Sequence, residues 1–155
     1  MARALVVDDD ASFRLGLADV LRLEGFVTDC ASTCQEALGE LAKGNVDLLV
    51  LDVNLPDGSG LDLLPRPEAP TVIVVTAEPS LSLADEALSL GAWDCLAKPV
   101  DRMRIRMTLA SLARERRMRD EISRLRQELA GPRRLNFVQP TAQRNRSELR
   151  RPRKR

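Results

Sequence analysis

The 155-residue chain is long enough for one domain with an appendage, and 44% of its residues are hydrophobic. It contains no histidine, which excludes histidine-based catalysis and histidine–metal sites. The net charge of +1 conceals a division along the chain. Residues 1–101 carry 6 Lys and Arg against 18 Asp and Glu, residues 102–130 carry 9 against 4, and residues 131–155 carry 9 against 1. An acidic body therefore precedes a basic helix and a very basic tail.

The pattern predicts neither a signal peptide nor a membrane span. The chain does not open with a charged segment followed by an apolar one, and no run of 18 apolar residues occurs. The three cysteines, an odd number, cannot all pair in disulfide bonds, and we expect them to be reduced thiols. They are Cys30, Cys34 and Cys95. We therefore expect a cytoplasmic protein with no membrane partner.

Hydrophobic spacing predicts strands that alternate with helices. Thr33 to Glu36 has the sequence of a capping box, and Pro79 is expected in the first turn of its helix. The segment 54–60, NLPDGSG, is expected to be a loop. Expected strands are 4–7, 26–31, 46–53, 71–77 and 93–97, and helices follow them at about 11–24, 34–43, 61–64, 79–90 and from 101 onwards. This alternation predicts a doubly wound parallel sheet covered on both faces.

Polar side chains stand where four of these strands end. Asp8 and Asp9 follow the first strand, Asp52 ends the third, Thr76 the fourth, and Lys98 follows the fifth. Because ligands of such sheets bind at the carboxyl ends of the strands, these residues are expected to converge. Clustered carboxylates favour a hard divalent cation, most simply Mg²⁺. A carboxylate beside that cation, a lysine and a hydroxyl suits phosphoryl transfer through an aspartyl-phosphate.

The segments LVVDDD, LDVNLPDGSG, VVTA and GAWDCLAKP occur in one chain and in this order. Together they resemble the receiver domain of two-component response regulators, over residues 3 to about 113. With the helical extension that follows, the chain is similar to the receivers of nitrogen-regulator-type enhancer-binding transcription regulators. The resemblance implies an α/β, flavodoxin-like fold whose five-stranded parallel sheet has the order 2-1-3-4-5, with an extended C-terminal helix.

The resemblance also implies a phosphoacceptor and a metal site. Asp52 would accept a phosphoryl group from a sensor histidine kinase. Asp9 would bind Mg²⁺ directly, Asp8 largely through water, and Asp52 and the backbone carbonyl of Asn54 would complete the ligand set. Asp10 is not needed for the metal and is expected near the start of the first helix.

Further roles follow from the same resemblance. Thr76 would hydrogen-bond the phosphoryl group, Lys98 would pair with it, and the bond before Pro99 is usually cis in the family. Cys95 stands where the family usually has Tyr or Phe, the partner of Thr76 in switching. The coupling is therefore expected to be altered, or Trp93 to contribute. The helix at 61–64 is also expected to be short, because a Pro-rich segment follows it.

The C-terminal third predicts a long helix and then a tail. Four apolar residues form an a/d seam of nearly two heptads, and a helix that continues past the domain could pair two copies. They are Met118, Ile122, Leu125 and Leu129. The alternative is a solvated amphipathic extension. We expect a receiver at 1–113, a helical linker at 114–130 and a disordered basic tail at 131–155.

The sequence thus predicts a switch that catalyses only its own phosphorylation and dephosphorylation. Phosphorylation would change the face made by helix 79–90, strand 93–97 and the helix from 101, and would thereby change how two copies pair in a homodimer. An output module would respond to this change, and DNA would be contacted only indirectly. Three alternatives stay open: a degenerate receiver used for protein contacts, nucleic-acid binding by the tail, and a phosphatase. The phosphatase is disfavoured because Asn54 occupies the position of the usual second Asp.

Overall fold

The computed structural model describes residues 2–64 and 70–131. The chain divides into two compact units, Met1–Arg106 and Met107–Arg155. The predicted boundaries 1–113, 114–130 and 131–155 therefore stay a prediction. Most of the Pro-rich segment and nearly all of the predicted disordered tail lie outside the described residues.

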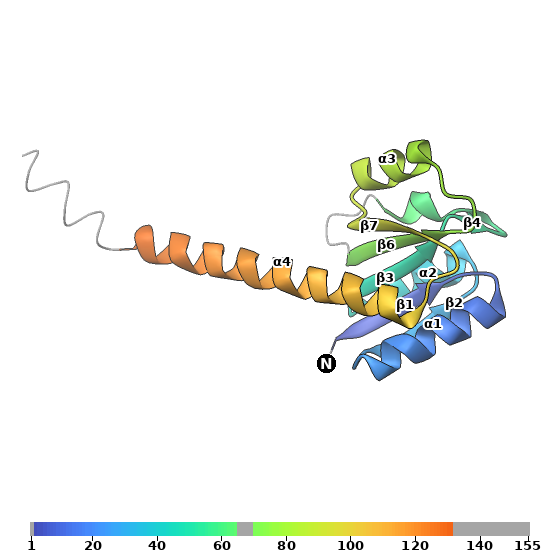
Figure 1. The fold of residues 1–155 in the computed structure, drawn as a ribbon, viewed down its shortest axis with the longest axis horizontal. Coiled ribbons are helices and arrows are strands. Elements are labelled where there is room, and N and C mark those ends of the chain that lie inside the picture. The colour runs from blue at the N-terminus through green and yellow to red at the C-terminus, as the bar shows by residue number, and fades with distance from the viewer. Residues whose placement is uncertain (1, 65–69, 132–155) are drawn as a thin grey trace, which may run out of the picture. The chain divides into compact units, whose positions relative to one another are not determined.

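The first unit is built on a five-stranded parallel sheet (Figure 1). Its strands pair in the order β2-β1-β3-β6-β7, which is 2-1-3-4-5 when they are numbered along the chain. The predicted flavodoxin-like order is therefore confirmed. The strands are β1 (Arg3–Val7), β2 (Val27–Ala31), β3 (Leu48–Asp52), β6 (Thr71–Thr76) and β7 (Asp94–Ala97).

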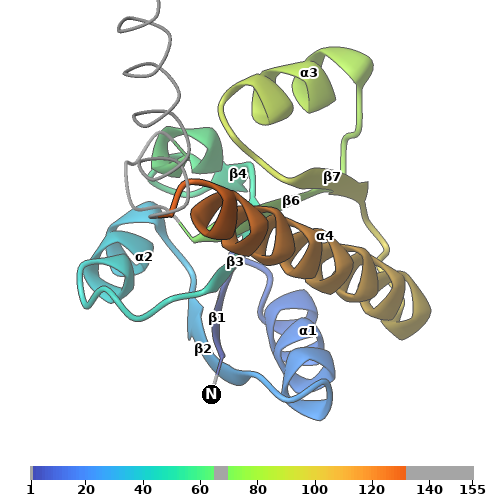
Figure 2. The ribbon, with the colours of Figure 1, turned by 90° about the vertical axis from the view of Figure 1, so that its left-hand side faces the viewer.

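Helices lie on both faces of this sheet. Figure 2 shows α1 and α2 on opposite sides of it, as a doubly wound fold requires. A four-residue 3-10 helix follows β3, in line with the short helix predicted there. The helices are α1 (Ala11–Leu23), α2 (Cys34–Leu41), the 3-10 helix η1 (Gly60–Leu63), α3 (Leu81–Ser89) and α4 (Arg102–Leu129).

The core follows the two-residue period of the strands. Leu5 and Val7 on β1 join one buried cluster with residues of α2, η1 and α3, including Ala37 and Ala87. All five residues of β3 are buried, as its continuous apolar run predicts for a central parallel strand. This packing holds the carboxyl ends of the strands, and the residues that follow them, at one edge.

The structure corrects three local expectations. Pro79 does not lie in the first turn of α3, because Ser80 is the N-cap and its hydroxyl accepts from Leu83 N–H. The capping box of α2 is shifted: Thr33 accepts from Glu36 N–H, but the Glu36 carboxylate accepts from Ser32 N–H. Each of these helices thus begins with the side chain of its N-cap residue accepting from the third backbone N–H of the helix.

The third correction concerns the loop after β3. It contains a short antiparallel hairpin, β4 (Asn54–Leu55) and β5 (Gly58–Ser59). Gly60 follows it, and a Cβ built on Gly60 would lie 2.0 Å from the backbone oxygen of Asp52. Only glycine therefore allows this close approach to Asp52.

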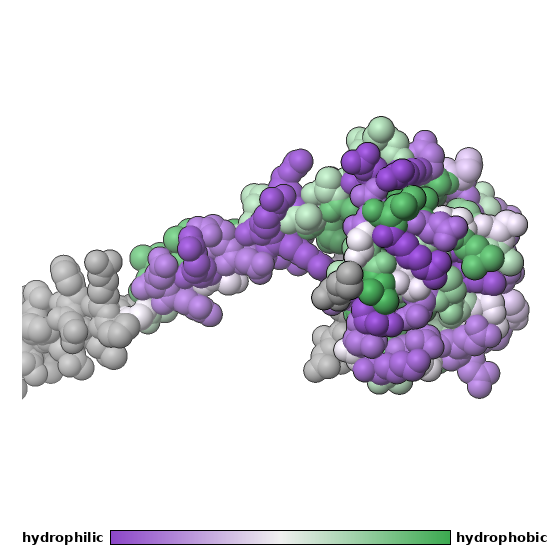
Figure 3. All heavy atoms as spheres, turned by 90° about the horizontal axis from the view of Figure 1, so that it is seen from below, coloured by the Kyte–Doolittle hydropathy of each residue, from purple (hydrophilic) through white to green (hydrophobic). Residues whose placement is uncertain are grey.

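The helix α4 is continuous over 28 residues, so the predicted C-terminal helix is confirmed. Asp101 caps it by accepting from Arg104 N–H. Hydrophilic side chains dominate its visible surface, although hydrophobic groups also reach it (Figure 3). The predicted seam is exposed: Met118 is 60% exposed, Ile122 46%, Leu125 45% and Leu129 76%. None of the helices in the described ranges is long and apolar enough to cross a membrane.

Candidate functional site

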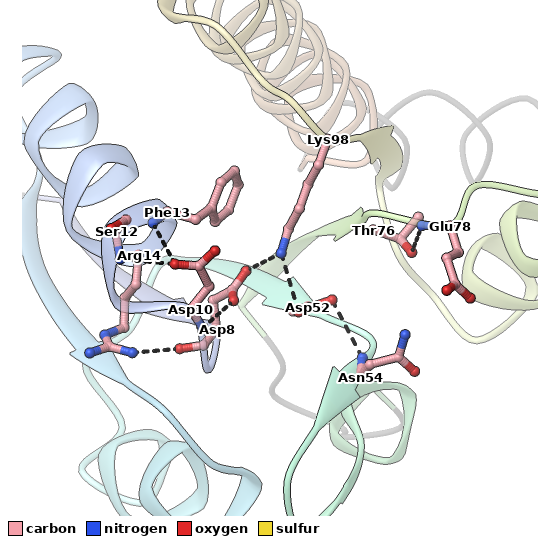
Figure 4. A network of polar contacts seen from close by, with 10 residues as sticks. All are labelled: Asp8, Asp10, Ser12, Phe13, Arg14, Asp52, Asn54, Thr76, Glu78 and Lys98. Atoms are coloured by element: carbon pink, nitrogen blue, oxygen red, sulfur yellow. Dashed lines mark hydrogen bonds and ion pairs between the residues drawn. The ribbon is translucent and has the colours of Figure 1, made fainter.

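Three of the predicted site residues contact one another at the carboxyl edge of the sheet. Lys98 Nζ lies 2.5 Å from Asp8 Oδ2 and 3.3 Å from Asp52 Oδ2 (Figure 4). Asp8 follows β1, Asp52 ends β3, and Lys98 follows β7, so the contact depends on three strands that are far apart in sequence. The expectation that these strand ends converge is confirmed.

The three consecutive carboxylates have three different environments. Asp8 is buried, and besides Lys98 it accepts a hydrogen bond of 2.9 Å from the backbone N–H of Asp10. Asp9 is exposed. Asp10 is the N-cap of α1, where its carboxylate accepts from two backbone N–H groups of the first turn. Burial with a cation, exposure to water and helix capping therefore offset the repulsion between these neighbours.

The ionisation of the site reflects its burial. Burial raises the pKa of Asp52, and the charge of Asp8 raises it further, while Lys98 opposes both effects. Burial alone would lower the pKa of Lys98, but its hydrogen bond to Asp8 and the charge of Asp52 outweigh burial and raise it. Lys98 is therefore a firmly held cation, whereas burial and the charge of Asp8 disfavour the ionised form of Asp52.

The acidic groups fit a divalent cation. One carboxylate oxygen from each of Asp8, Asp9 and Asp52 lies within 4.8 Å of the others. Three carboxylates against one ammonium leave two negative charges, and oxygen ligands are those that Mg²⁺ prefers. The Asn54 backbone N–H donates to Asp52 Oδ1 at 3.4 Å, so Asn54 adjoins the same carboxylate.

Thr76 ends β6 with a buried side chain. Its hydroxyl oxygen accepts from the backbone N–H of Glu78 at 3.1 Å and keeps its own O–H as a donor. Its backbone carbonyl accepts from Lys98 N–H at 2.8 Å. The ends of β6 and β7 are thus connected directly beside the site, and the peptide bond between Lys98 and Pro99 is cis, as expected.

Sequence reasoning missed two neighbours of the site on α1. The ring of Phe13 lies against the Lys98 ammonium, with 4.3 Å from the nitrogen to the ring centroid. Arg14 donates from Nη1 to the backbone oxygen of Asp8 at 2.7 Å. Phe13 fits the apolar spacing of a helix, and no local signal in the sequence indicates either contact.

The predicted switch residue Cys95 is half-buried and packs against the core cluster. Burial raises the pKa of its thiol. Trp93 lies just before β7, and its backbone N–H donates to Val72 O at 2.7 Å. The roles of Cys95 and Trp93 in switching stay predictions.

Comparison with known proteins agrees with this geometry. The family model described as "Response regulator receiver domain" matches residues 4–110. The response regulator PilR of Pseudomonas aeruginosa is 41% identical over 119 residues, which are 74% of this chain but only 26% of PilR. The chain therefore spans about a quarter of that relative.

Solved structures show the same fold. A CheY-like receiver domain from Methanospirillum hungatei matches with a TM-score of 0.71 and 27% identity, covering 77% of this chain and 98% of that one. The beryllofluoride-activated NtrC4 receiver domain dimer matches with a TM-score of 0.67 and 34% identity, covering 72% and 95%. With the site geometry and the family match over residues 4–110, the chain belongs to the response regulator receiver family of two-component systems.

Proposed function

We propose that this receiver is a working phosphorylation switch in which Asp52 accepts a phosphoryl group from a sensor histidine kinase. The observation that carries the proposal is the contact of Lys98 with both Asp8 and Asp52. A lone strand-end aspartate needs no such partner. Here a buried carboxylate stands beside a fixed cation and two more acidic groups, a combination suited to phosphoryl transfer.

Mg²⁺ would be held by Asp8, Asp9, Asp52 and the backbone carbonyl of Asn54, with Asp8 acting largely through water. The ion would supply charge neutralisation for the transferring group. One observation supports this assignment: a carboxylate oxygen from each of Asp8, Asp9 and Asp52 lies within 4.8 Å of the others. The exposure of Asp9 leaves one ligand open to water, which suits an ion that keeps part of its hydration shell.

The residues of the chain then have distinct tasks in the transfer. A carboxylate oxygen of Asp52 attacks phosphorus, and the bond from phosphorus to the donor nitrogen breaks. Lys98, which now contacts Asp52, pairs with an oxygen of the phosphoryl group. The Thr76 hydroxyl donates a hydrogen bond to another oxygen of the phosphoryl group. The reaction acts on the protein's own side chain, so we assign catalysis only of its own phosphorylation and dephosphorylation.

Phosphorylation would change the face made by α3, β7 and the first turn of α4. The added charge is the local event, and it draws Lys98 and Thr76 toward the phosphoryl group. The backbone bond from Lys98 N–H to Thr76 O ties the end of β7 to the end of β6. A movement of Thr76 is therefore transmitted to the end of β7, and a movement of Lys98 to the end of β6.

We further propose that two copies pair through the exposed seam of α4, which the seam's four exposed apolar residues support. In the heptad set by Ile122 as an a position, Glu121 takes the preceding g position and Arg126 the following e position. In a parallel pair, Glu121 faces Arg126 of a second copy. An antiparallel pair would place like charges together at Arg119 and Arg126 and at Glu121 and Glu128, so the charges favour parallel pairing.

Control of transcription by an output module is the further step of this proposal. It is supported by the similarity to the DNA-binding transcriptional regulator NtrC of Rhizobium meliloti, of which the chain covers 22%. Two alternatives to the phosphorylation switch remain to be tested. A degenerate receiver would use the same fold for protein contacts, and the basic tail, outside the described residues, could bind nucleic acid without sequence preference.

Beryllofluoride, which stands in for the phosphoryl group on Asp52, tests the proposal directly. Wild type should bind it only with Mg²⁺, as measured by calorimetry and Trp93 fluorescence, and the Asp52→Asn variant should not. Size measurement of the same samples tests the linked dimer. Calorimetry without any binding would favour the degenerate receiver, whatever Trp93 reports. Salt-dependent binding to DNA that disappears when residues 131–155 are deleted would support the tail alternative.

A further inference from the structure

Asp57, at the tip of the hairpin after the phosphoacceptor, reaches the start of α2. Its two carboxylate oxygens accept from the backbone N–H groups of Cys34 and Gln35, at 2.8 and 3.0 Å. These groups belong to the first turn of α2, where N–H groups have no partner within the helix. The third N–H of that turn, on Glu36, is taken by the helix's own cap, Thr33. Asp57 therefore lies in the turn of the hairpin, within the segment expected to be a loop, and is also a second cap of α2.

The hairpin needs such an anchor. Each of its strands has two residues, with Asn54 opposite Ser59 and Leu55 opposite Gly58. An isolated two-stranded hairpin, even a longer one, is marginal in water. The hairpin's base is closed by the bond from Gly60 N–H to Val53 O, at 2.7 Å. Asp57, in the turn between Leu55 and Gly58, adds a contact from the tip to a separate element.

A second contact joins the same two segments. The Cys34 thiol donates to the backbone oxygen of Ser59 at 3.7 Å. Since Ser59 pairs with Asn54 across the hairpin, α2 holds the strand opposite Asn54 as well as the tip. The two N–H donors also lower the pKa of Asp57, so this carboxylate stays charged throughout the neutral range.

We propose that Asp57 is a positioning residue for the metal: by anchoring the hairpin to α2 it orients the backbone carbonyl of Asn54. The proposal rests on the proposed function, in which that carbonyl is a Mg²⁺ ligand. Asp57 does not touch the reacting atoms. Its effect is transmitted through the hairpin. Loss of the Asp57 side chain should make the position of the Asn54 carbonyl less fixed, while the positions of Asp8 and Asp52 stay the same.

Thr33→Ala provides a matched control for Asp57→Ala. Each substitution removes a cap from the same first turn of α2, but only Asp57 belongs to the hairpin. Both variants should lower the melting temperature. Calorimetry should show Mg²⁺ affinity reduced roughly tenfold in Asp57→Ala, the scale for groups that orient metal ligands, and unchanged in Thr33→Ala. Asp57→Asn, which keeps one accepting oxygen, should fall between Asp57→Ala and wild type.

A second measurement needs no metal. Hydrogen exchange in EDTA should become faster at the backbone N–H groups of residues 54–60 other than Pro56 in Asp57→Ala, and stay at the wild-type rate in Thr33→Ala. Unchanged Mg²⁺ affinity and unchanged exchange in Asp57→Ala, with normal binding by wild type, would overturn the positioning role alone. Equal loss of affinity in Thr33→Ala would also overturn it, because the stability of α2 would then be the cause. Wild type that binds no Mg²⁺ would overturn the proposed function together with this inference.

Discussion

The ammonium nitrogen of Lys98 lies 4.3 Å from the centroid of the Phe13 ring, while the same nitrogen contacts Asp8 and Asp52. The side chain of Lys98 is 16% exposed, so the ring replaces water that would otherwise surround the cation. A ring face attracts a cation most strongly where water is excluded. Phe13 therefore helps to hold Lys98 at the site from α1, the helix after β1.

This relationship predicts an energetic coupling between the two side chains. In a double-mutant cycle of Phe13→Leu and Lys98→Met, unfolding in denaturant should give a coupling of about 1 kcal/mol, in the range measured for such pairs. Leucine keeps an apolar side chain but has no ring. If the losses of unfolding free energy in the two single variants simply add in the double variant, the ring and the ammonium do not interact. The loss of stability in Phe13→Leu would then come from packing.

Asp52→Asn should stabilise the metal-free fold at neutral pH. Burial and the Asp8 charge raise the pKa of Asp52, so its ionised form opposes folding. That cost is fully present above the raised pKa and disappears as the pH falls below the ordinary aspartate range. Thermal unfolding in EDTA should therefore show a higher melting temperature for Asp52→Asn than for wild type. The difference should correspond to about 1 kcal/mol of unfolding free energy at pH 7–8 and become progressively smaller toward pH 4.

Mg²⁺ should reverse this order, because it binds the ionised carboxylate and stabilises wild type by mass action. The same titration in Asp52→Asn serves as the control. A difference that is constant across this pH range would show that the variant acts by packing rather than by charge.

Gly60→Ala should damage both the fold and the acceptor. The new Cβ would lie 2.0 Å from the backbone oxygen of Asp52, so the backbone of the acceptor must move. We expect a loss of about 1–3 kcal/mol in stability, typical of overpacking, and weaker beryllofluoride binding. Gly39→Ala on α2 is the control. It meets no atom within 4 Å and should gain about 0.5–1 kcal/mol from helix propensity.

The proposed parallel dimer can be tested by exchanging charges. Glu121→Arg should weaken the beryllofluoride-bound dimer by placing Arg at the g position opposite Arg126, and adding Arg126→Glu should restore it. Ultracentrifugation measures the change. Leu125→Asp should abolish pairing, whereas Gln127→Asp, at an outward f position, should leave it intact. If Leu125→Asp dimerises as well as wild type, the seam is not the interface.

Several parts of this protein could be predicted because their signals are local. The continuous apolar run of β3 indicated a central parallel strand, and Thr33 indicated the start of α2 from its position just before the helix. The convergence of Asp8, Asp52 and Lys98 followed from topology, since parallel strands present their carboxyl ends at one edge. Strand order then placed these residues together without any knowledge of side-chain contacts.

Other features were decided only by tertiary structure. Asp57 has the sequence signature of a turn, yet its carboxylate caps α2, 22 and 23 residues earlier in the chain. Phe13 fits a helical apolar stripe, yet its ring meets a lysine 85 positions away. Sequence patterns report short-range periodicity and capping, which the backbone decides within one or two turns. Contacts between distant segments depend on how the whole sheet packs, and the residues concerned therefore became visible only in the folded protein.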